Sequence, residues 1–125
     1  MADTFVRKQR IQSGKTERLR ELLAEMTEEA RADEDGVLEI WEGESLHTLS
    51  LFIERTDDAD YLVWYIEADD IDQLIEFRQN STHPLHDIED EMMAAVLEGP
   101  ESVTEYEPVF HGVNPNRPQE FVARQ

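Results

Sequence analysis

The chain has 125 residues, the usual size of one domain, and 39% of them are hydrophobic, which is enough for one core. It contains no cysteine, which excludes a disulfide framework, a thiolate metal site and a cysteine nucleophile. Thirty acidic residues against eleven basic ones give a formal net charge of −19, which argues against nucleic-acid binding because the phosphate backbone needs a basic footprint.

No apolar run approaches the roughly 18 residues of a membrane span, and residues 1–8 lack an apolar signal core. We therefore expect a cytoplasmic protein with no membrane partner. Acidic residues are spread along the chain, and this pattern predicts adaptation to a salt-rich cytoplasm. At molar salt the Debye length falls to about 3 Å, so that a carboxylate-dense surface no longer repels itself strongly.

The charge is uneven along the chain. Residues 1–31 carry seven basic and six acidic side chains, whereas residues 32–125 carry four and twenty-four. The basic residues near the start are Arg7, Lys8, Arg10, Lys15, Arg18 and Arg20. They could form a local anion site, or they could pair with the acidic remainder of the chain.

In chain order, residues 4–12 are rich in strand formers and predict an edge strand. Apolar residues then recur at helical spacing over 16–43, which predicts one long helix or two abutting helices broken near Asp35-Gly36. Residues 46–55 and 61–67 predict a β-hairpin, joined by a turn-rich segment.

The second half of the chain predicts two more helices. Asp69 or Asp70 caps the first of them, and the next runs from about Pro84 to Leu97, where Gly99-Pro100 ends it. A last strand is predicted around Tyr106 to His111.

The resulting order β-α-β-β-α-β predicts an α+β fold of the ferredoxin-like kind, a single antiparallel sheet with helices on one face. We expect residues 1–111 to form this one domain. Residues 112–125, which contain Pro115 and Pro118, are expected to form an extended C-terminal arm.

The predicted hairpin has two unlike faces. Its core face carries Leu49, Leu51, Ile53, Leu62, Trp64 and Ile66. Its outer face carries Thr48, Ser50, Phe52, Tyr61, Val63 and Tyr65, with the charges of Glu54 and Glu67 only at the strand ends. Because 33% of the chain is charged, an uncharged outer face indicates that something covers it. The simplest cover is a second copy, which would give a two-fold homodimer.

Several segments resemble an uncharacterised family common in halophilic archaea. They are Ile11-Gln12-Ser13-Gly14-Lys15-Thr16, Phe52-Ile53-Glu54-Arg55, Asp60-Tyr61-Leu62-Val63-Trp64-Tyr65 and Ser81-Thr82-His83-Pro84. That family looks like a branch of the dimeric α+β barrels, which include cofactor-free monooxygenases, haem-degrading enzymes and small isomerases. The resemblance implies a dimer and supplies no catalytic residues.

The outer face of the hairpin is one candidate site. Its hydroxyl and aromatic side chains, Thr48, Ser50, Phe52, Tyr61 and Tyr65, could line a cavity in the barrel and bind a small organic molecule. They could instead fill a solid dimer interface, in which case the protein would be a non-enzymatic assembly module.

The stretch from His83 to Glu91 is the other candidate site, because it combines two histidines with several carboxylates. On a helix His86 and Asp90 lie one turn apart, a spacing at which they could share a divalent metal. A carboxylate could also orient His83 or His86 as a general base for oxygenase or isomerase chemistry, with no cofactor expected. The alternative is a helix cap, with acidic residues in a first turn where the helix dipole favours them.

Overall fold

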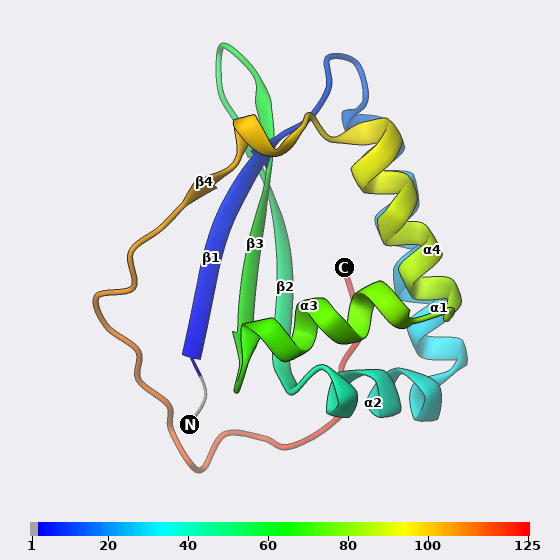
Figure 1. Ribbon diagram of the computed structural model, residues 1–125, viewed down its shortest axis with the longest axis vertical. Coiled ribbons are helices and arrows are strands. Elements are labelled where there is room, and N and C mark those ends of the chain that lie inside the picture. Colours follow the sequence, from blue (N-terminus) through cyan, green and yellow to red (C-terminus); the bar gives the residue numbers. More distant parts are fainter. Residues whose placement is uncertain (1–2) are drawn as a thin grey trace.

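The computed structural model describes residues 3–125. Within this range one antiparallel sheet has the strand order β2-β3-β1-β4, and the helices lie on one side of it (Figure 1). The strands are β1 (Asp3–Arg10), β2 (Leu46–Arg55), β3 (Asp60–Ala68) and β4 (Thr104–Glu105). The helices are α1 (Thr16–Ala32), α2 (Glu34–Gly43), α3 (Ile71–Asn80) and α4 (Pro84–Glu91), with a π-helical turn η1 (Met92–Val96) and a 3-10 turn η2 (Pro100–Ser102). The predicted α+β, ferredoxin-like fold is confirmed.

Aspartates set the starts of two helices. Asp33 leaves the helical conformation and accepts a hydrogen bond from the Gly36 N–H at 3.1 Å, so α2 begins with its own cap just before the predicted break. Asp70 accepts hydrogen bonds from the N–H groups of Asp72 and Gln73, which confirms one of the two predicted caps of α3. Among residues 3–125, none of the helices combines the length and apolarity that crossing a bilayer requires.

Two strand predictions are wrong. Strand β1 pairs with β3 along its whole length and with β4 on its other side, so it is not an edge strand. Residues 106–111 contain no strand, because the chain pairs with β1 only at Thr104–Glu105 and through one further bond from the Tyr106 N–H to the Val6 carbonyl, at 3.0 Å. Pro108 is two residues further on the same side and has no N–H to donate, so the ladder ends there.

The core fills the space between the sheet and the helices. Leu62 and Trp64 of β3, Leu19 and Leu22 of α1, and Met92 are each at most 1% exposed. The hairpin register pairs the predicted core residues Leu49, Leu51 and Ile53 with Ile66, Trp64 and Leu62. The predicted outer face is confirmed as well, since Ser50 pairs with Tyr65 and Phe52 with Val63.

The outer face of the sheet is less neutral than the hairpin alone predicted. Strand β1 brings Lys8 and Arg10 onto it, opposite Val63 and Tyr61. Lys8 Nζ lies 3.0 Å from Glu54 Oε1 and 4.4 Å from the centre of the Tyr61 ring. The uncharged part of this face therefore lies on β2 and β3, where Phe52 of the edge strand β2 is 58% exposed.

Residues 106–125 contain no helix or strand and run around the domain as an arm. In Figure 1 the arm descends from β4, turns beneath the strands and returns on the helix side. Its end is held there, because Arg31 Nε donates to the Ala123 carbonyl at 2.6 Å and the Phe121 ring lies 5.8 Å from that of Trp41. The arm thus touches both layers of the fold.

Candidate functional site

Four ionisable side chains of the helical layer meet in the interior, and we call them the buried charge cluster: Glu44, Arg78, His86 and Glu89. Glu44, His86 and Glu89 are 1%, 4% and 7% exposed. Arg78 Nε lies 2.9 Å from Glu89 Oε2 and 3.4 Å from Glu44 Oε2, and His86 Nε2 lies 3.6 Å from the same Glu44 oxygen. Burying charges is unfavourable unless they are paired and hydrogen-bonded, so this cluster needs an explanation.

Three helices bring the cluster together. Glu44 directly follows α2, Arg78 lies in the last turn of α3, where the helix dipole favours a cation, and α4 carries the other two residues. His86 and Glu89 are three positions apart on α4 and therefore share a face of the helix, the one that is turned inward.

The cluster is incompletely hydrogen-bonded. Although Arg78 Nε is close to Glu89, its N–H does not point at the carboxylate. Within residues 3–125, Arg78 Nε, Glu44 Oε2, Glu89 Oε2 and His86 Nδ1 are buried without a hydrogen-bond partner. Burial raises the pKa of Glu89, against the lowering effect of Arg78 and His86. Unpaired buried groups with shifted pKa values are typical of functional sites.

The polar region continues onto the sheet through Arg7. Its guanidinium lies 5.6 Å from the ring of Trp64, its cross-strand partner. Burial, and then the nearby charge of Arg78, lower the pKa of Arg7. Arg7 Nε and Trp64 Nε1 are also buried with no hydrogen-bond partner in the described part of the chain. Arginine and tryptophan thus extend the cluster from the helices to the centre of the sheet.

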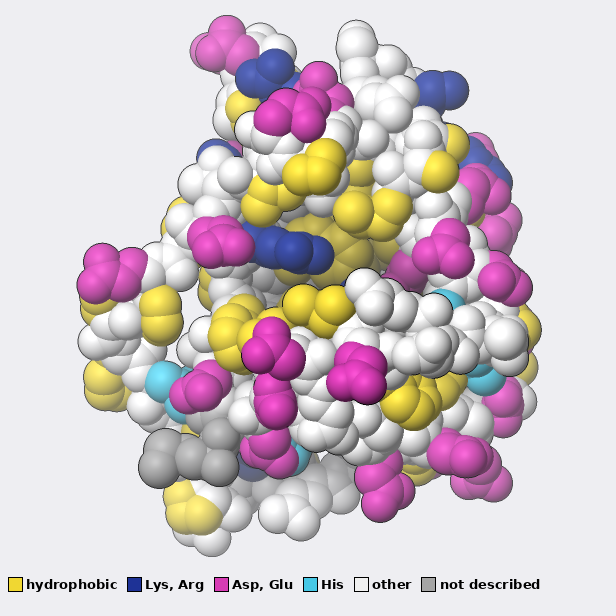
Figure 2. Space-filling view, in the orientation of Figure 1, with side chains coloured by type: hydrophobic (Ala, Val, Ile, Leu, Met, Phe, Trp, Pro, Cys, Tyr) yellow, Lys and Arg dark blue, Asp and Glu magenta, His cyan; other side chains and the backbone are white. Residues whose placement is uncertain are grey.

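Figure 2 shows a hollow on this side of the molecule. Hydrophobic side chains, in yellow, form its walls, and a basic side chain, in dark blue, crosses it, while acidic side chains lie around its rim. In the orientation shared with Figure 1, the hollow lies between the strands and α4, above α3. These are the elements that carry Arg7, Trp64, Arg78 and the two cluster residues of α4.

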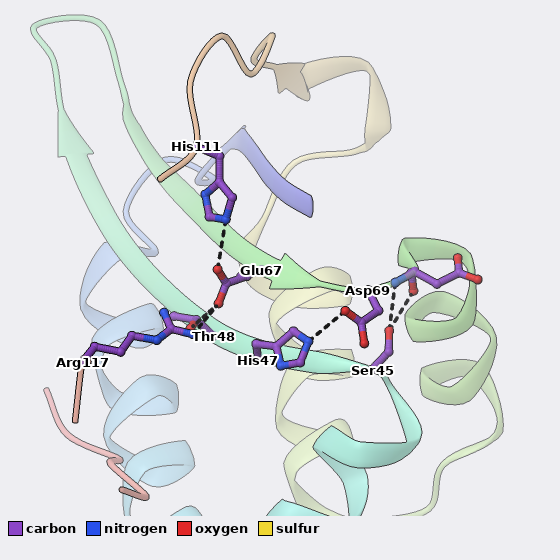
Figure 3. Close-up of polar contacts among 8 residues, drawn as sticks. Ser45, His47, Thr48, Glu67, Asp69, His111 and Arg117 are labelled. Carbon is purple, nitrogen blue, oxygen red and sulfur yellow. Dashed lines mark hydrogen bonds and ion pairs between the residues drawn. The ribbon is translucent and has the colours of Figure 1, made fainter. Parts of the chain in front are cut away.

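A second polar group lies on the outer face and fastens the arm (Figure 3). Glu67 at the end of β3 is 2% exposed and accepts a hydrogen bond from Thr48 Oγ1 at 3.2 Å. From the arm, His111 Nε2 lies 3.3 Å from Glu67 Oε2, and Arg117 Nη2 lies 3.4 Å from Oε1. These contacts use the charge of Glu67 to hold the arm across the end of the sheet.

The five predicted ligand residues of the hairpin share the outer face but differ in their surroundings. Tyr65 lines a hollow of about 420 Å³ with Thr4, Val6 and residues 106–112 of the arm. The Thr48 hydroxyl donates a hydrogen bond to Glu67, and the Tyr61 hydroxyl accepts one from Arg10 at 3.3 Å. Ser50 is half-buried, whereas Phe52 is exposed. A role for them in ligand binding stays a prediction.

The predicted histidines are placed differently from one another. His83 Nδ1 accepts from the Leu85 N–H at 3.1 Å, and its Nε2 lies 3.1 Å from Asp33 Oδ2, so His83 caps α4 and ties it to α2. His86 points inward to Glu44, whereas Asp90 is exposed. Residues 3–125 contain no group of three or more His, Asp or Glu side chains arranged to hold a metal ion. The metal-binding role of His86 and Asp90 stays a prediction.

Sequence reasoning found His86 but missed Arg7, Glu44, Arg78 and Glu89 as its neighbours. One feature of the sequence does indicate that Glu89 is buried. Glu89 is four residues after Leu85 and three before Met92, both of which are buried, so helical spacing predicts that Glu89 faces the core.

Fold and site together define a ferredoxin-like α+β protein with an incompletely paired charge cluster between its layers. The chain belongs to a family of unknown function, DUF6176, whose model matches residues 2–117. No curated protein matches it.

Two solved structures are similar to the chain. One is Rv0793 from Mycobacterium tuberculosis, with 18% identity over 90% of this chain and 100% of that chain, at a TM-score of 0.54. The other is a dimeric protein of unknown function and ferredoxin-like fold from Bacteroides fragilis NCTC 9343, with 14% identity over 87% and 96%, at a TM-score of 0.51. At identities this low, the structural similarity establishes a shared fold and nothing more.

Proposed function

We propose that this protein is a homodimer that binds a small organic molecule between its sheet and its helices, with the buried charge cluster at the polar end of the site. The observation that carries the proposal is a gathering of buried polar atoms without hydrogen-bond partners in residues 3–125. They belong to Arg7, Glu44, Trp64, Arg78, His86 and Glu89. A purely structural network would pair such atoms, whereas ligand sites combine apolar walls with a few converging polar groups.

The chemistry that this cluster supports best is proton transfer, as in an isomerase-type reaction that needs no cofactor. His86 is an imidazole base with a carboxylate, Glu44, 3.6 Å from its Nε2. Burial raises the pKa of Glu89, which favours a proton on this group at a higher pH than on an ordinary glutamate. A base and an acid of this kind on one side of a ligand can move a proton between two of its atoms.

The outer face supports the pairing of two copies. The Bacteroides fragilis neighbour is a dimeric protein of the same fold. On the outer face Phe52 of the edge strand β2 is 58% exposed, and beside this face Val109 and Phe110 of the arm are 87% and 88% exposed. A second copy packed sheet to sheet would remove this apolar surface from water.

Trp64 is a natural reporter for the proposed site, because it is buried there and the second tryptophan, Trp41, packs on Phe121 of the arm. In a Trp41→Phe variant all tryptophan emission comes from Trp64, and in a Trp64→Phe variant it comes from Trp41. We expect fragments from a library of small organic molecules to change the emission of the first variant saturably and to leave the second unchanged. Equal responses in both variants, or no response in the first at millimolar concentration, would show that the site is wrong.

A further inference from the structure

We propose that the ligand of this site is a small organic anion whose carboxylate binds to Arg7 and Trp64. This inference rests on the proposed function and adds the chemical class of the ligand. Three observations on residues 3–125 support it. Arg7 has no close acidic partner, two buried N–H donors lack acceptors, and the hollow has apolar walls.

The charge balance leaves Arg7 without an acidic partner. Arg78 has Glu44 and Glu89 as ion-pair partners, at 3.4 and 2.9 Å. Among residues 3–125 no carboxylate oxygen lies within 4.0 Å of the Arg7 guanidinium, although the chain has thirty acidic residues. Glu105, opposite Arg7 on β4, is exposed, and its charge raises the pKa of Arg7 less than burial and Arg78 each lower it. An anion placed beside Arg7 would supply the missing partner and offset its repulsion with Arg78.

Two N–H donors that have no acceptor within residues 3–125 lie on facing residues of β1 and β3. Arg7 Nε and Trp64 Nε1 are buried without acceptors in the described part of the chain, and they belong to residues that face each other across β1 and β3. A carboxylate has two oxygens that can each accept one N–H, and hydrogen bonds to a charged acceptor are stronger than bonds to a neutral one. A neutral amide offers one acceptor oxygen and no negative charge to pair with Arg7.

The surroundings favour an organic anion. Figure 2 shows a basic side chain inside a hollow with hydrophobic walls, whereas acidic side chains lie on its rim. Attraction between opposite charges is stronger beside apolar walls than in water. The walls would contact the hydrocarbon part of a ligand, which an inorganic anion does not have.

Benzoate and benzamide are a matched pair of probes, because they have nearly the same shape and differ in charge. We would titrate the full chain with each of them by calorimetry at constant ionic strength. Hydrogen bonds and an ion pair to a charged acceptor are stronger than hydrogen bonds to a neutral one, so benzoate should bind about tenfold more tightly than benzamide. Arg7→Met keeps an unbranched side chain over Trp64 and should remove this preference. Arg55→Met, at the exposed end of β2, is the matched control and should keep it.

The outcomes separate this inference from the proposed function. Equal affinity for the two probes, with both of them changing Trp64 emission, would overturn the anionic ligand and leave the proposed function standing. A benzoate preference that survives in Arg7→Met would overturn the role of Arg7. Binding of neither probe would overturn the carboxylate assignment, and the proposed function fails with it only if the fragment screen is also empty. If Arg7→Met does not fold, Trp64→Phe removes the indole N–H together with part of the ring, and the lost N–H should weaken benzoate binding more than benzamide binding.

Discussion

Glu89 is a charged residue on the buried face of α4, with Arg78 2.9 Å away as its nearest cation. Desolvation favours its neutral form, whereas Arg78 and His86 favour its charged form, and burial is the larger effect. Its pKa is therefore raised in the folded protein, so the native state holds this proton where the unfolded chain has released it. That difference makes the stability of the protein depend on pH.

We expect Glu89→Gln to reveal this dependence, because glutamine does not titrate. As the pH rises from the ordinary glutamate pKa, about 4.3, through the raised folded value, the wild type should lose stability relative to Glu89→Gln. Above the folded pKa of Glu89, the difference in unfolding free energy between the two proteins should be constant. Urea unfolding of both proteins from about pH 4 to about pH 8 measures this difference.

Glu28→Gln is the control for this experiment, because Glu28 is an exposed glutamate on α1. Its unfolding free energy relative to wild type should change much less over the same pH range. A Glu89→Gln difference that is flat, or that rises in favour of the wild type as the pH increases, would contradict the raised pKa of Glu89.

At the residue scale, sequence reasoning reached only part of the site. Carboxylates surround His86 in the sequence, but its partner in the structure is Glu44, which lies 42 positions earlier and follows a different helix. The meeting of Glu44, Arg78 and Glu89 depends on how three helices pack, which hydrophobic periodicity does not specify. Arg7 was noted as a basic residue, but its position over Trp64 depends on the register of β1 with β3.

At the scale of elements, His83 connects two helix starts. Its Nδ1 accepts the Leu85 N–H at the start of α4, so Nε2 carries the proton and donates to Asp33, the cap of α2. This hydrogen bond, followed by the one from the Gly36 N–H, lowers the pKa of Asp33. The stabilisation from Asp33 is accordingly present above the ordinary aspartate pKa and is lost as the pH falls through the lowered folded value.

We expect His83→Ala to destabilise the protein by about 1 kcal/mol, the usual effect of losing a helix cap, and His83→Asn to recover much of this loss because asparagine also caps helices. Denaturant unfolding at neutral pH measures both variants. Benzoate binding should be unchanged in each of them. If His83→Ala instead abolishes binding or activity while stability is kept, the general-base role predicted for His83 from the sequence would be supported and the purely structural role contradicted.

Elements with strong periodicity were predicted well, and the failures have local causes. The hairpin and its two faces were predicted correctly, because apolar and polar residues alternate along both strands and only one register buries the apolar side chains together. Residues 106–111 include Tyr106, Val109 and Phe110, which are strand formers, yet Pro108 ends the pairing with β1. These apolar side chains are exposed on the arm instead.

At the scale of the whole molecule, basic residues near the start of the chain pair with acidic ones, which is one of the two roles that the sequence left open. Lys8, Arg10 and Arg18 form ion pairs with Glu54, Glu98 and Glu91. Arg7 faces the opposite side of β1, toward the helices, where it has Trp64 and Arg78 as neighbours. Alternation along one strand therefore separates surface ion pairs from the proposed anion site.

The proposed dimer predicts a selective effect of charge on the outer face. Phe52→Glu places a carboxylate on the exposed apolar part of that face, so that a partner copy would have to bury it, and it should shift the protein from dimer to monomer. Ile75→Glu is a matched control, because Ile75 is 46% exposed on α3 in the helical layer. Sedimentation equilibrium of the wild type and both variants gives the masses. A wild-type monomer, or a dimer that Phe52→Glu leaves intact, would contradict pairing through this face.

A crystal structure of the full chain grown with benzoate would locate the ligand directly. We expect two copies packed through their outer sheet faces, each with the benzoate carboxylate within hydrogen-bond distance of Arg7 Nε and Trp64 Nε1 and its ring against the apolar walls of the hollow. A structure in which side chains fill the hollow, the buried polar atoms of the cluster pair with one another and benzoate lies elsewhere would contradict the assignment of this space as a ligand site.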